Sequence, residues 1–401
     1  MSRPWTVLIL LSLAVFLAYS LWLSASAVLP ALTREWDLSD GGRAWMTMAV
    51  QLGFVAGALG SAFLNLPDIV SARALFAVSA LGGAVVNGAI PLWVEGPAAA
   101  IPLRFLTGMF LAGVYPPGLK IMATWFVRGR GTALGILVGA LTVGSALPHL
   151  LNALGAPDWR RTMWTASALS VLAAALAATV IREGPYAVAS PPFQWRYAFR
   201  LWRDPALRLA NFGYLGHMWE LYAVWAWLPL FLLESFRITG GGDPRSGAGV
   251  AAFAAIGAGG LGCAAAGVIA DRYGRTLTTV LSMTVSGACC LGAGLLFGAA
   301  PPLVWTVALA WGFAVVADSA QFSTSVTELG DPAYRGTLLT AQVAVGFLLT
   351  LVSIRLMPVL VGWVGWRYAF VAIAPGPALG CLAMWRLRAR PEAVQLAGGM
   401  R

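Results

Sequence analysis

The chain has 401 residues, of which 59% are hydrophobic and only 10% carry a charge. Soluble domains average about 45–50% apolar and about 25% charged residues, so this composition excludes a soluble globular protein and indicates a polytopic membrane protein. The net charge of +10 is best explained by arginine-rich loops on the cytoplasmic side of a bilayer. We therefore expect the lipid bilayer as a partner and no nucleic acid.

Twelve apolar segments follow one another, each long enough to cross a bilayer. A polar, proline-containing stretch over residues 183–205 separates them into two sets of six and predicts a cytoplasmic linker. The sequence thus predicts an all-α integral membrane protein, with six-helix bundles over 1–182 and 206–390 and a cytoplasmic tail over 391–401. The predicted spans are roughly 5–30, 44–64, 74–94, 98–123, 131–153, 162–182, 206–233, 247–270, 276–299, 302–326, 336–361 and 367–386.

The placement of basic residues orients the predicted spans. With the N-terminus inside, 17 of the 26 basic residues fall on the inner side and seven on the outer side, while Arg104 and Arg355 remain within spans. Cytoplasmic loops collect lysine and arginine. Both termini are therefore predicted to lie in the cytoplasm.

Four short matches between the two sets of spans indicate an internal repeat. Their offsets of 199, 203, 205 and 207 residues drift slowly and keep their order, which favours two homologous halves over chance. An arrangement of two parallel halves, with a binding site between them near the bilayer midplane, is typical of transporters. The matched pairs are Pro30 with Pro229, Asp68 with Asp271, Arg130-Gly-Thr with Arg335-Gly-Thr, and Trp159-Arg160 with Trp366-Arg367.

Several motifs resemble those of the major facilitator superfamily. Its loop signature is resembled by the loop Gly267-Val-Ile-Ala-Asp271-Arg272-Tyr-Gly274-Arg275. A degenerate copy of the same motif in the first half ends at Asp68 and is followed by Arg73. The fourth span begins Arg104-Phe-Leu-Thr-Gly108, which resembles the fourth-helix motif of the superfamily. With the twelve-span plan, the resemblance covers nearly the whole chain. It implies two pseudo-symmetric six-helix bundles, as in the twelve-span transporters of bacteria.

The resemblance also implies a role for the charged residues of the two loop motifs. The glycines there allow a tight turn, and an aspartate can point at the positive N-terminal end of a neighbouring helix. The residues expected to hold the cytoplasmic gate are Asp68, Arg73, Asp271, Arg272 and Arg275. The alternative is that they only set loop geometry and topology.

Three ionisable residues within the spans are candidates for proton coupling. A charge at that depth is costly, so it normally faces a cavity, a partner or a proton path. Glu220 lies near the middle of the seventh span, His217 precedes it by one turn, and Asp318 lies in the tenth span. His217 and Glu220 can share one helix face. The alternative for Glu220 is a structural hydrogen bond to another helix. The alternative for His217 is a buried histidine whose hydrogen bonds serve only the packing of the helices.

Two arginines are candidates for binding an anionic solute. Arginine keeps its charge, so Arg104 and Arg355 each need a carboxylate, a water-filled cavity or an anionic substrate, unless they snorkel to the surface. The resemblance implies that spans 1, 4, 7 and 10 line a central cavity, with Arg104 facing Glu220 across it. Polar and aromatic candidates for its wall are Tyr222, Gln51, Trp219 and Tyr115.

We find no phosphate-binding glycine motif, clustered nucleophile, metal-ligand spacing or cofactor motif, so we expect neither an enzyme nor direct ATP use. The expected function is a secondary active transporter of the cytoplasmic membrane. It would act as a monomer and move a small anionic or carboxylate-bearing solute together with protons. The alternative is proton-driven efflux of lipophilic or cationic compounds, against which the missing Gly-Pro pair in the fifth span weighs. A membrane enzyme or a receptor is the remaining class.

Overall fold

The computed structural model describes residues 3–64, 66–126, 130–154, 158–186, 193–239 and 243–401. These residues form α-helices and short 3-10 helices, and they contain no strand. Eleven helical segments among them are long and apolar enough to cross a membrane, and the predicted first span is represented by a shorter apolar helix. The all-helical prediction is therefore confirmed.

The first half of the chain contains ten helices within the described residues. They are α1 (Arg3–Tyr19), α2 (Ser24–Ala27), α3 (Leu29–Trp36), α4 (Asp40–Phe63), α5 (Leu66–Ile69), α6 (Ala72–Trp93), α7 (Pro97–Leu111), α8 (Tyr115–Ala123), α9 (Arg130–Leu154) and α10 (Trp159–Thr179).

Two short helices, α11 (Trp195–Ala198) and α12 (Arg200–Arg203), lie in the predicted linker. The second half follows as α13 (Pro205–Thr239), α14 (Pro244–Tyr273), α15 (Arg275–Gly292), η1 (Ala293–Leu296), α16 (Pro301–Ala317), α17 (Ser319–Leu329), η2 (Pro332–Tyr334), α18 (Arg335–Val364), α19 (Trp366–Ala369), η3 (Phe370–Ile373), α20 (Pro375–Arg388) and η4 (Pro391–Gly399).

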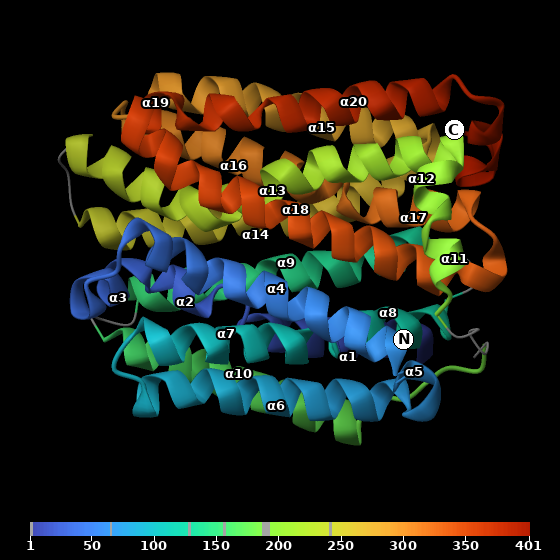
Figure 1. Ribbon diagram of the computed structural model, residues 1–401, viewed down its shortest axis with the longest axis horizontal. Helices are drawn as coiled ribbons and strands as arrows, with labels where there is room; N and C mark the ends of the chain where they lie inside the picture. Colours follow the sequence, from blue (N-terminus) through green and yellow to red (C-terminus); the bar gives the residue numbers. More distant parts are fainter. Residues whose placement is uncertain (1–2, 65, 127–129, 155–157, 187–192, 240–242) are drawn as a thin grey trace.

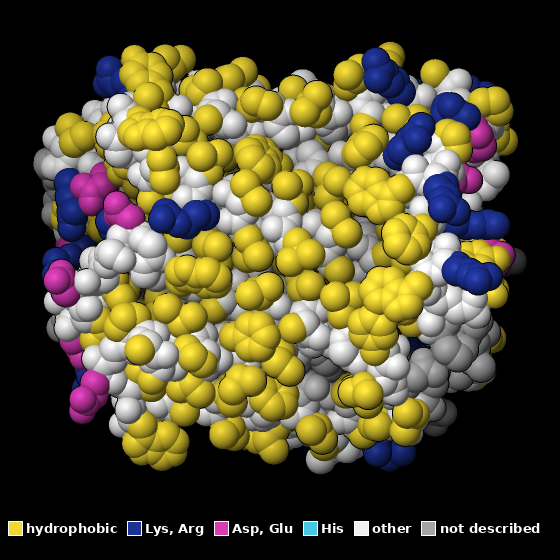
Figure 2. All heavy atoms as spheres, viewed as in Figure 1, with side chains coloured by type: hydrophobic (Ala, Val, Ile, Leu, Met, Phe, Trp, Pro, Cys, Tyr) yellow, Lys and Arg dark blue, Asp and Glu magenta, His cyan; other side chains and the backbone are white. Residues whose placement is uncertain are grey.

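The two halves of the chain form two layers of roughly parallel helices (Figure 1). Both chain ends and the linker helices α11 and α12 lie at one end of the molecule, which we call the linker face. Helices α3 and α19 lie at the other end, the opposite face. Figure 2 shows apolar side chains across the middle and charged side chains concentrated toward these two ends. A bilayer-spanning protein requires this distribution, because charges are costly in hydrocarbon.

Close backbone contacts repeat in the two halves. Helix α7 packs on α4, and α16 packs on α14. A Cβ on Gly108 would collide with the Val50 carbonyl, and a Cβ on Gly312 would collide with the Ala255 carbonyl. Each residue of the second pair lies 204 or 205 residues beyond its counterpart. Small residues allow such approach between spans, so the three-dimensional packing preserves the repeat found in the sequence.

Four predicted spans are interrupted, which their apolar composition did not indicate; in the twelfth, η3 and Ala374 separate α19 from α20. The first breaks between Tyr19 and Ser24, the fourth between Leu111 and Tyr115, and the tenth at Asp318. The breaks in the fourth and tenth spans occupy equivalent positions in the repeat. An interruption frees backbone groups, and in a membrane these need protein or water partners. At the fourth-span interruption local turns supply such partners, since Gly113 N–H donates to the Phe110 carbonyl and Val114 N–H to the Leu111 carbonyl.

The predicted tail is folded against the linker face. Its 3-10 segment η4 buries Ala393 and Leu396 completely. The backbone N–H of Ala397 donates to Glu328 Oε2 of α17 at 3.0 Å. The tail is thus part of the packed second half.

The glycine contacts give a test of this packing. We expect Gly312→Ala to reduce the free energy of unfolding by about 1–3 kcal/mol, because its methyl group overpacks the α14–α16 contact. Gly257→Ala is the matched control, since a Cβ on Gly257 meets no atom within 4 Å. Thermal unfolding of the purified variants measures both effects. Equal melting temperatures for the two variants would contradict the close approach.

Candidate functional site

Four aromatic rings meet where the two halves face each other. Trp22 comes from the interrupted first span, Phe54 from α4, Tyr222 from α13 and Phe347 from α18. The ring centroid of Trp22 lies 5.4 Å from that of Phe54, 5.8 Å from Tyr222 and 5.7 Å from Phe347. All four side chains are buried. We call this group, two rings from each half, the central aromatic cluster.

Tyrosines extend this cluster along the boundary between the halves. The ring centroid of Tyr19 lies 5.7 Å from that of Trp22 and 6.4 Å from that of Tyr115, and Tyr214 lies 6.2 Å from the ring of His217. The sequence predicted Tyr115 and Tyr222 as wall residues. Tyr19 and Tyr214 were not among the predicted wall residues; Tyr214 lies eight residues, about two helical turns, before Tyr222 on α13, and this spacing was an available signal.

Buried amide side chains of the spans add hydrogen-bonding capacity, and Gln51 lies three residues from Phe54 on α4. Gln51 Oε1 accepts from Thr350 Oγ1 of the other half at 3.3 Å, and Gln51 Nε2 has no partner among the described residues. The side-chain amides of Asn211 and Gln342 are fully buried and also have none there. Buried polar groups are normally hydrogen-bonded, so these amides are suited to bind water or polar groups of a solute.

His217 and Asp318 lie in close contact in the interior, and His217 precedes Tyr222 of the cluster by five residues on α13. His217 Nδ1 lies 2.8 Å from Asp318 Oδ1, and each side chain is only 1% exposed. The other ring nitrogen, Nε2, lies 3.2 Å from Ser319 Oγ. Neither oxygen of Asp318 makes a well-aligned hydrogen bond within the described residues. The pair connects α13 to the interruption of the tenth span and keeps capacity for another donor.

The side chain of Glu220 makes its hydrogen bonds to other residues of the second half. Its carboxylate accepts hydrogen bonds from Ser286 Oγ at 2.8 Å, Cys290 Sγ at 3.2 Å and Trp311 Nε1 at 2.7 Å. These donors belong to α15 and α16, so Glu220 ties spans 7, 9 and 10 together. His217 and Glu220 are one turn apart on α13, yet they contact different neighbours.

Arg104 is fully buried and its partners all lie in the first half. Its guanidinium donates to the carbonyls of Leu21 at 3.0 Å and Trp22 at 2.6 Å, to Ser24 Oγ and Asn87 Oδ1 at 3.0 Å, and to the Met46 carbonyl at 3.5 Å. Arg104 thus satisfies carbonyls at the break of the first span and holds the backbone of Trp22. Arg104 and Glu220 share none of these partners.

Two further candidates lie away from the central aromatic cluster. Arg355 is exposed, and its Nη2 lies 3.9 Å from the position that a Cβ on Gly41 would occupy, near the start of α4. Trp219 packs against Gly376 of α20, within the second half. The structure thus places Arg355 toward the opposite face and Trp219 between two helices of one bundle.

The second-half loop motif forms an ion-pair network at the linker face. Arg275 pairs with Asp271 at 2.8 Å and with Glu328 at 3.1 Å, and it donates to Gln321 Oε1 at 3.1 Å. Arg272 extends over the ring of Tyr273 at 5.4 Å. The sequence did not single out Glu328, although an acid close to the end of the predicted tenth span was an available signal.

The first-half copy of this motif is only partly described. The side chain of Asp68 lies outside the described residues, and Arg73 lies in the first turn of α6. The N-terminus of α6 is capped from another segment, because the Ala72 N–H donates to Glu183 Oε1 at 2.9 Å.

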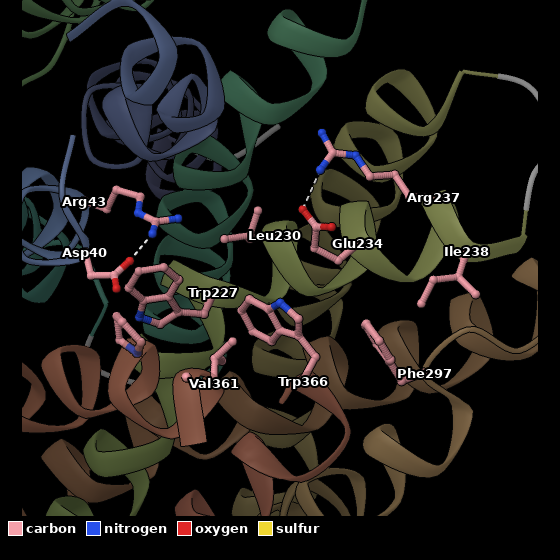
Figure 3. Close-up of a pocket in the computed structure, with 12 residues that line it drawn as sticks. Asp40, Arg43, Trp227, Leu230, Glu234, Arg237, Ile238, Phe297, Val361 and Trp366 are labelled. Atoms are coloured by element: carbon pink, nitrogen blue, oxygen red, sulfur yellow. Dashed lines mark hydrogen bonds and ion pairs between the residues drawn. The ribbon is translucent and has the colours of Figure 1, made fainter. Parts of the chain in front are cut away.

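A cleft of about 440 Å³ opens at the opposite face between the two halves. Asp40 and Arg43 of α4 lie on one side of it, and Glu234 and Arg237 of α13 on the other (Figure 3). Each of these acid–arginine couples is an ion pair within one helix. We call this feature the opposite-face cleft.

The family model of the Major Facilitator Superfamily matches residues 11–354 of the chain. The chain therefore belongs to this superfamily of transporters, as its loop motifs indicated, and it is a multi-pass protein of the cytoplasmic membrane rather than an enzyme.

Curated relatives are similar over only part of their length. The chain is 28% identical over 178 residues to a puromycin resistance protein of Streptomyces alboniger, covering 43% of this chain and 34% of that protein. It is 24% identical over 227 residues to the putative niacin/nicotinamide transporter NiaP of Bacillus subtilis, covering 53% of this chain and 55% of that protein. In both cases the chain spans less than two thirds of the relative.

Solved structures are similar over the whole chain. The nucleoside transporter NupG matches with a TM-score of 0.72 at 16% identity, covering 95% of this chain and 99% of that one. A bacterial homologue of the human lysosomal transporter Spinster matches with a TM-score of 0.71 at 15% identity, covering 98% and 99%. These likenesses show the fold.

The hydrogen bonds of Arg104 generate a stability prediction. We expect Arg104→Gln to lower the melting temperature strongly, because buried groups left unpaired cost about 1–3 kcal/mol each. Arg355→Gln is the control: an exposed side chain should change stability by no more than about 0.5 kcal/mol. A stable Arg104→Gln protein that binds an anionic solute more weakly would instead favour a substrate role.

Proposed function

We propose that this protein is a secondary transporter that alternates between two open states and couples the movement of a small aromatic solute to protons. The observation that carries the coupling is the His217–Asp318 pair, which is buried and lies where the tenth span is interrupted. Ionisable groups inside a membrane commonly serve as proton relays.

The geometry of the pair supports a way to link protonation to movement. When Asp318 is charged, it attracts protonated His217 and holds α13 against the junction of α16 and α17. A proton on Asp318 removes that attraction and frees a helix junction that is already interrupted. Glu220 is the second candidate proton site. Its three donors stabilise the carboxylate, so releasing it would require α15 and α16 to shift.

The central aromatic cluster supports a solute with a flat ring. Aromatic pairs gain about 0.5–1.5 kcal/mol beyond simple burial, and rings from both halves can hold such a solute between them. The amides of Gln51, three residues from Phe54 on α4, and of Gln342, five residues from Phe347 on α18, could bind its polar edges. The names of the relatives point the same way, since puromycin, nicotinamide and nucleosides all contain planar rings.

The proposal has two versions, which differ in the charge of the solute. An anionic or carboxylate-bearing solute was expected from Arg104 and Arg355, but Arg104 already donates to five acceptors and Arg355 is exposed. Efflux of a lipophilic or cationic compound is the second candidate function. It is favoured by Asp318, whose Oδ2 has no hydrogen-bond partner among the described residues and could attract a cation.

The proton role of the pair is tested with proteoliposomes. We expect Asp318→Asn to reduce pH-driven solute accumulation at least about tenfold, equivalent to ~1.4 kcal/mol, while solute exchange at equal pH continues. His217→Gln should act in the same direction. Normal pH-driven accumulation in both variants would remove the pair from the coupling role. Glu220→Gln is measured alongside, and normal accumulation there would remove Glu220 alone.

The ring preference is tested with three labelled probes, namely nicotinate, nicotinamide and puromycin. We expect Phe347→Ala to weaken binding of the preferred probe at least about fivefold, because one stacking surface is lost. Leu348→Ala is the neighbouring control, since Leu348 is exposed on the same helix. Preference for nicotinate over nicotinamide would support the anionic version, and preference for puromycin the efflux version. Binding of none of the three would contradict the aromatic-solute proposal.

A further inference from the structure

Two tryptophans, Trp227 and Trp366, contribute to the lining of the opposite-face cleft. Pro358 of α18 has no backbone N–H, so the Ile354 carbonyl lacks its usual helix donor. The indole N–H of Trp227 donates to this carbonyl at 3.0 Å and so fixes its ring in the cleft. Trp366 lines the same cleft and packs near Phe231 and Phe370. Figure 3 shows both indole rings between the two ion pairs of the cleft.

The charged side chains around the cleft form only weak ion pairs. Asp40–Arg43 and Glu234–Arg237 are exposed pairs within single helices, and such pairs contribute only about 0–1 kcal/mol. A ligand can therefore share or replace a partner at little cost. The cleft volume of about 440 Å³ falls within the usual size of small-molecule sites.

The two sides of the cleft are not equivalent for an anion. Arg43 lies in the first turn of α4, where the helix dipole is positive. Arg237 lies in the last turn of α13, where the dipole is negative. Arg355, next to Gly41, adds a further positive charge beside α4. An anionic group is therefore favoured on the Arg43 side.

We propose that the opposite-face cleft is a second binding site, separate from the central aromatic cluster, for an aromatic monocarboxylate. The ring lies against Trp227 and Trp366, and the carboxylate pairs with Arg43. Trp227 follows Tyr222 by five residues on α13, which is a rise of about 7.5 Å along the helix. The proposed site is therefore nearer to the opposite face than the central aromatic cluster is. Because its walls come from both halves, closing the opposite face would expel the ligand.

This site does not depend on the proposed coupling or on the central aromatic cluster. Its direct test is binding of benzoate, with benzamide as the uncharged probe, to the purified full chain in lipid nanodiscs by ligand-observed NMR titration. The variants are Arg43→Gln and Trp366→Ala. Their matched controls are Arg245→Gln, an exposed arginine in the first turn of α14, and Trp363→Ala, a tryptophan that is 78% exposed.

We expect Arg43→Gln to weaken benzoate binding at least about fivefold, equivalent to ~1 kcal/mol, and to leave benzamide binding nearly unchanged. Trp366→Ala should weaken both probes, and the two controls should weaken neither. The proposal is overturned if benzoate does not bind the wild-type chain, or if Arg43→Gln binds it normally. It is also overturned if Phe347→Ala, rather than the cleft variants, removes binding. Failure of the Asp318→Asn transport test would leave these outcomes untouched.

Discussion

Inside a bilayer no bulk water is available to satisfy polar groups, and the rest of this structure depends on that constraint. The first span is interrupted between Tyr19 and Ser24, and Arg104 of the fourth span supplies donors to carbonyls there. The tenth span is interrupted at Asp318, which His217 of the seventh span approaches within ion-pair distance. Each of these two interruptions is thus contacted by an ionisable residue on another span of the same half.

Buried charged side chains are hydrogen-bonded within one half, whereas the halves meet mostly through apolar side chains, together with hydrogen bonds such as that from Thr350 Oγ1 to Gln51 Oε1. Arg104 is satisfied in the first half, and Glu220 in the second. Between the halves, α4 lies along α18 and α9 along α14, with Trp22 and Phe347 in ring contact. Dispersion contacts lack the directionality of buried hydrogen bonds, so two bundles that meet in this way can change their relative tilt while each keeps its internal network.

Several residues of the candidate site could be predicted from the sequence, but their partners could not. His217, Glu220 and Asp318 stood out because charges are rare in apolar spans. Helical spacing put His217 and Glu220 on one face, yet His217 faces Asp318 whereas Glu220 accepts from Ser286 and other donors of spans 9 and 10. One face of a helix touches several neighbours, and small differences in rotation decide which neighbour each side chain meets. Trp22 and Phe347 gave no distinct signal, because an aromatic residue in an apolar span can equally face lipid.

The sequence alone determined that this is an all-helical membrane protein, and its motifs, now matched by the family model, indicated the superfamily. Composition and hydrophobic length govern partition into a bilayer, and both are local properties of the chain. Only the tertiary structure decided where spans break, that Arg104 holds the backbone of Trp22, and that a cleft lies between α4 and α13. These features depend on distances between segments far apart in the chain, and helix crossing and side-chain packing set those distances.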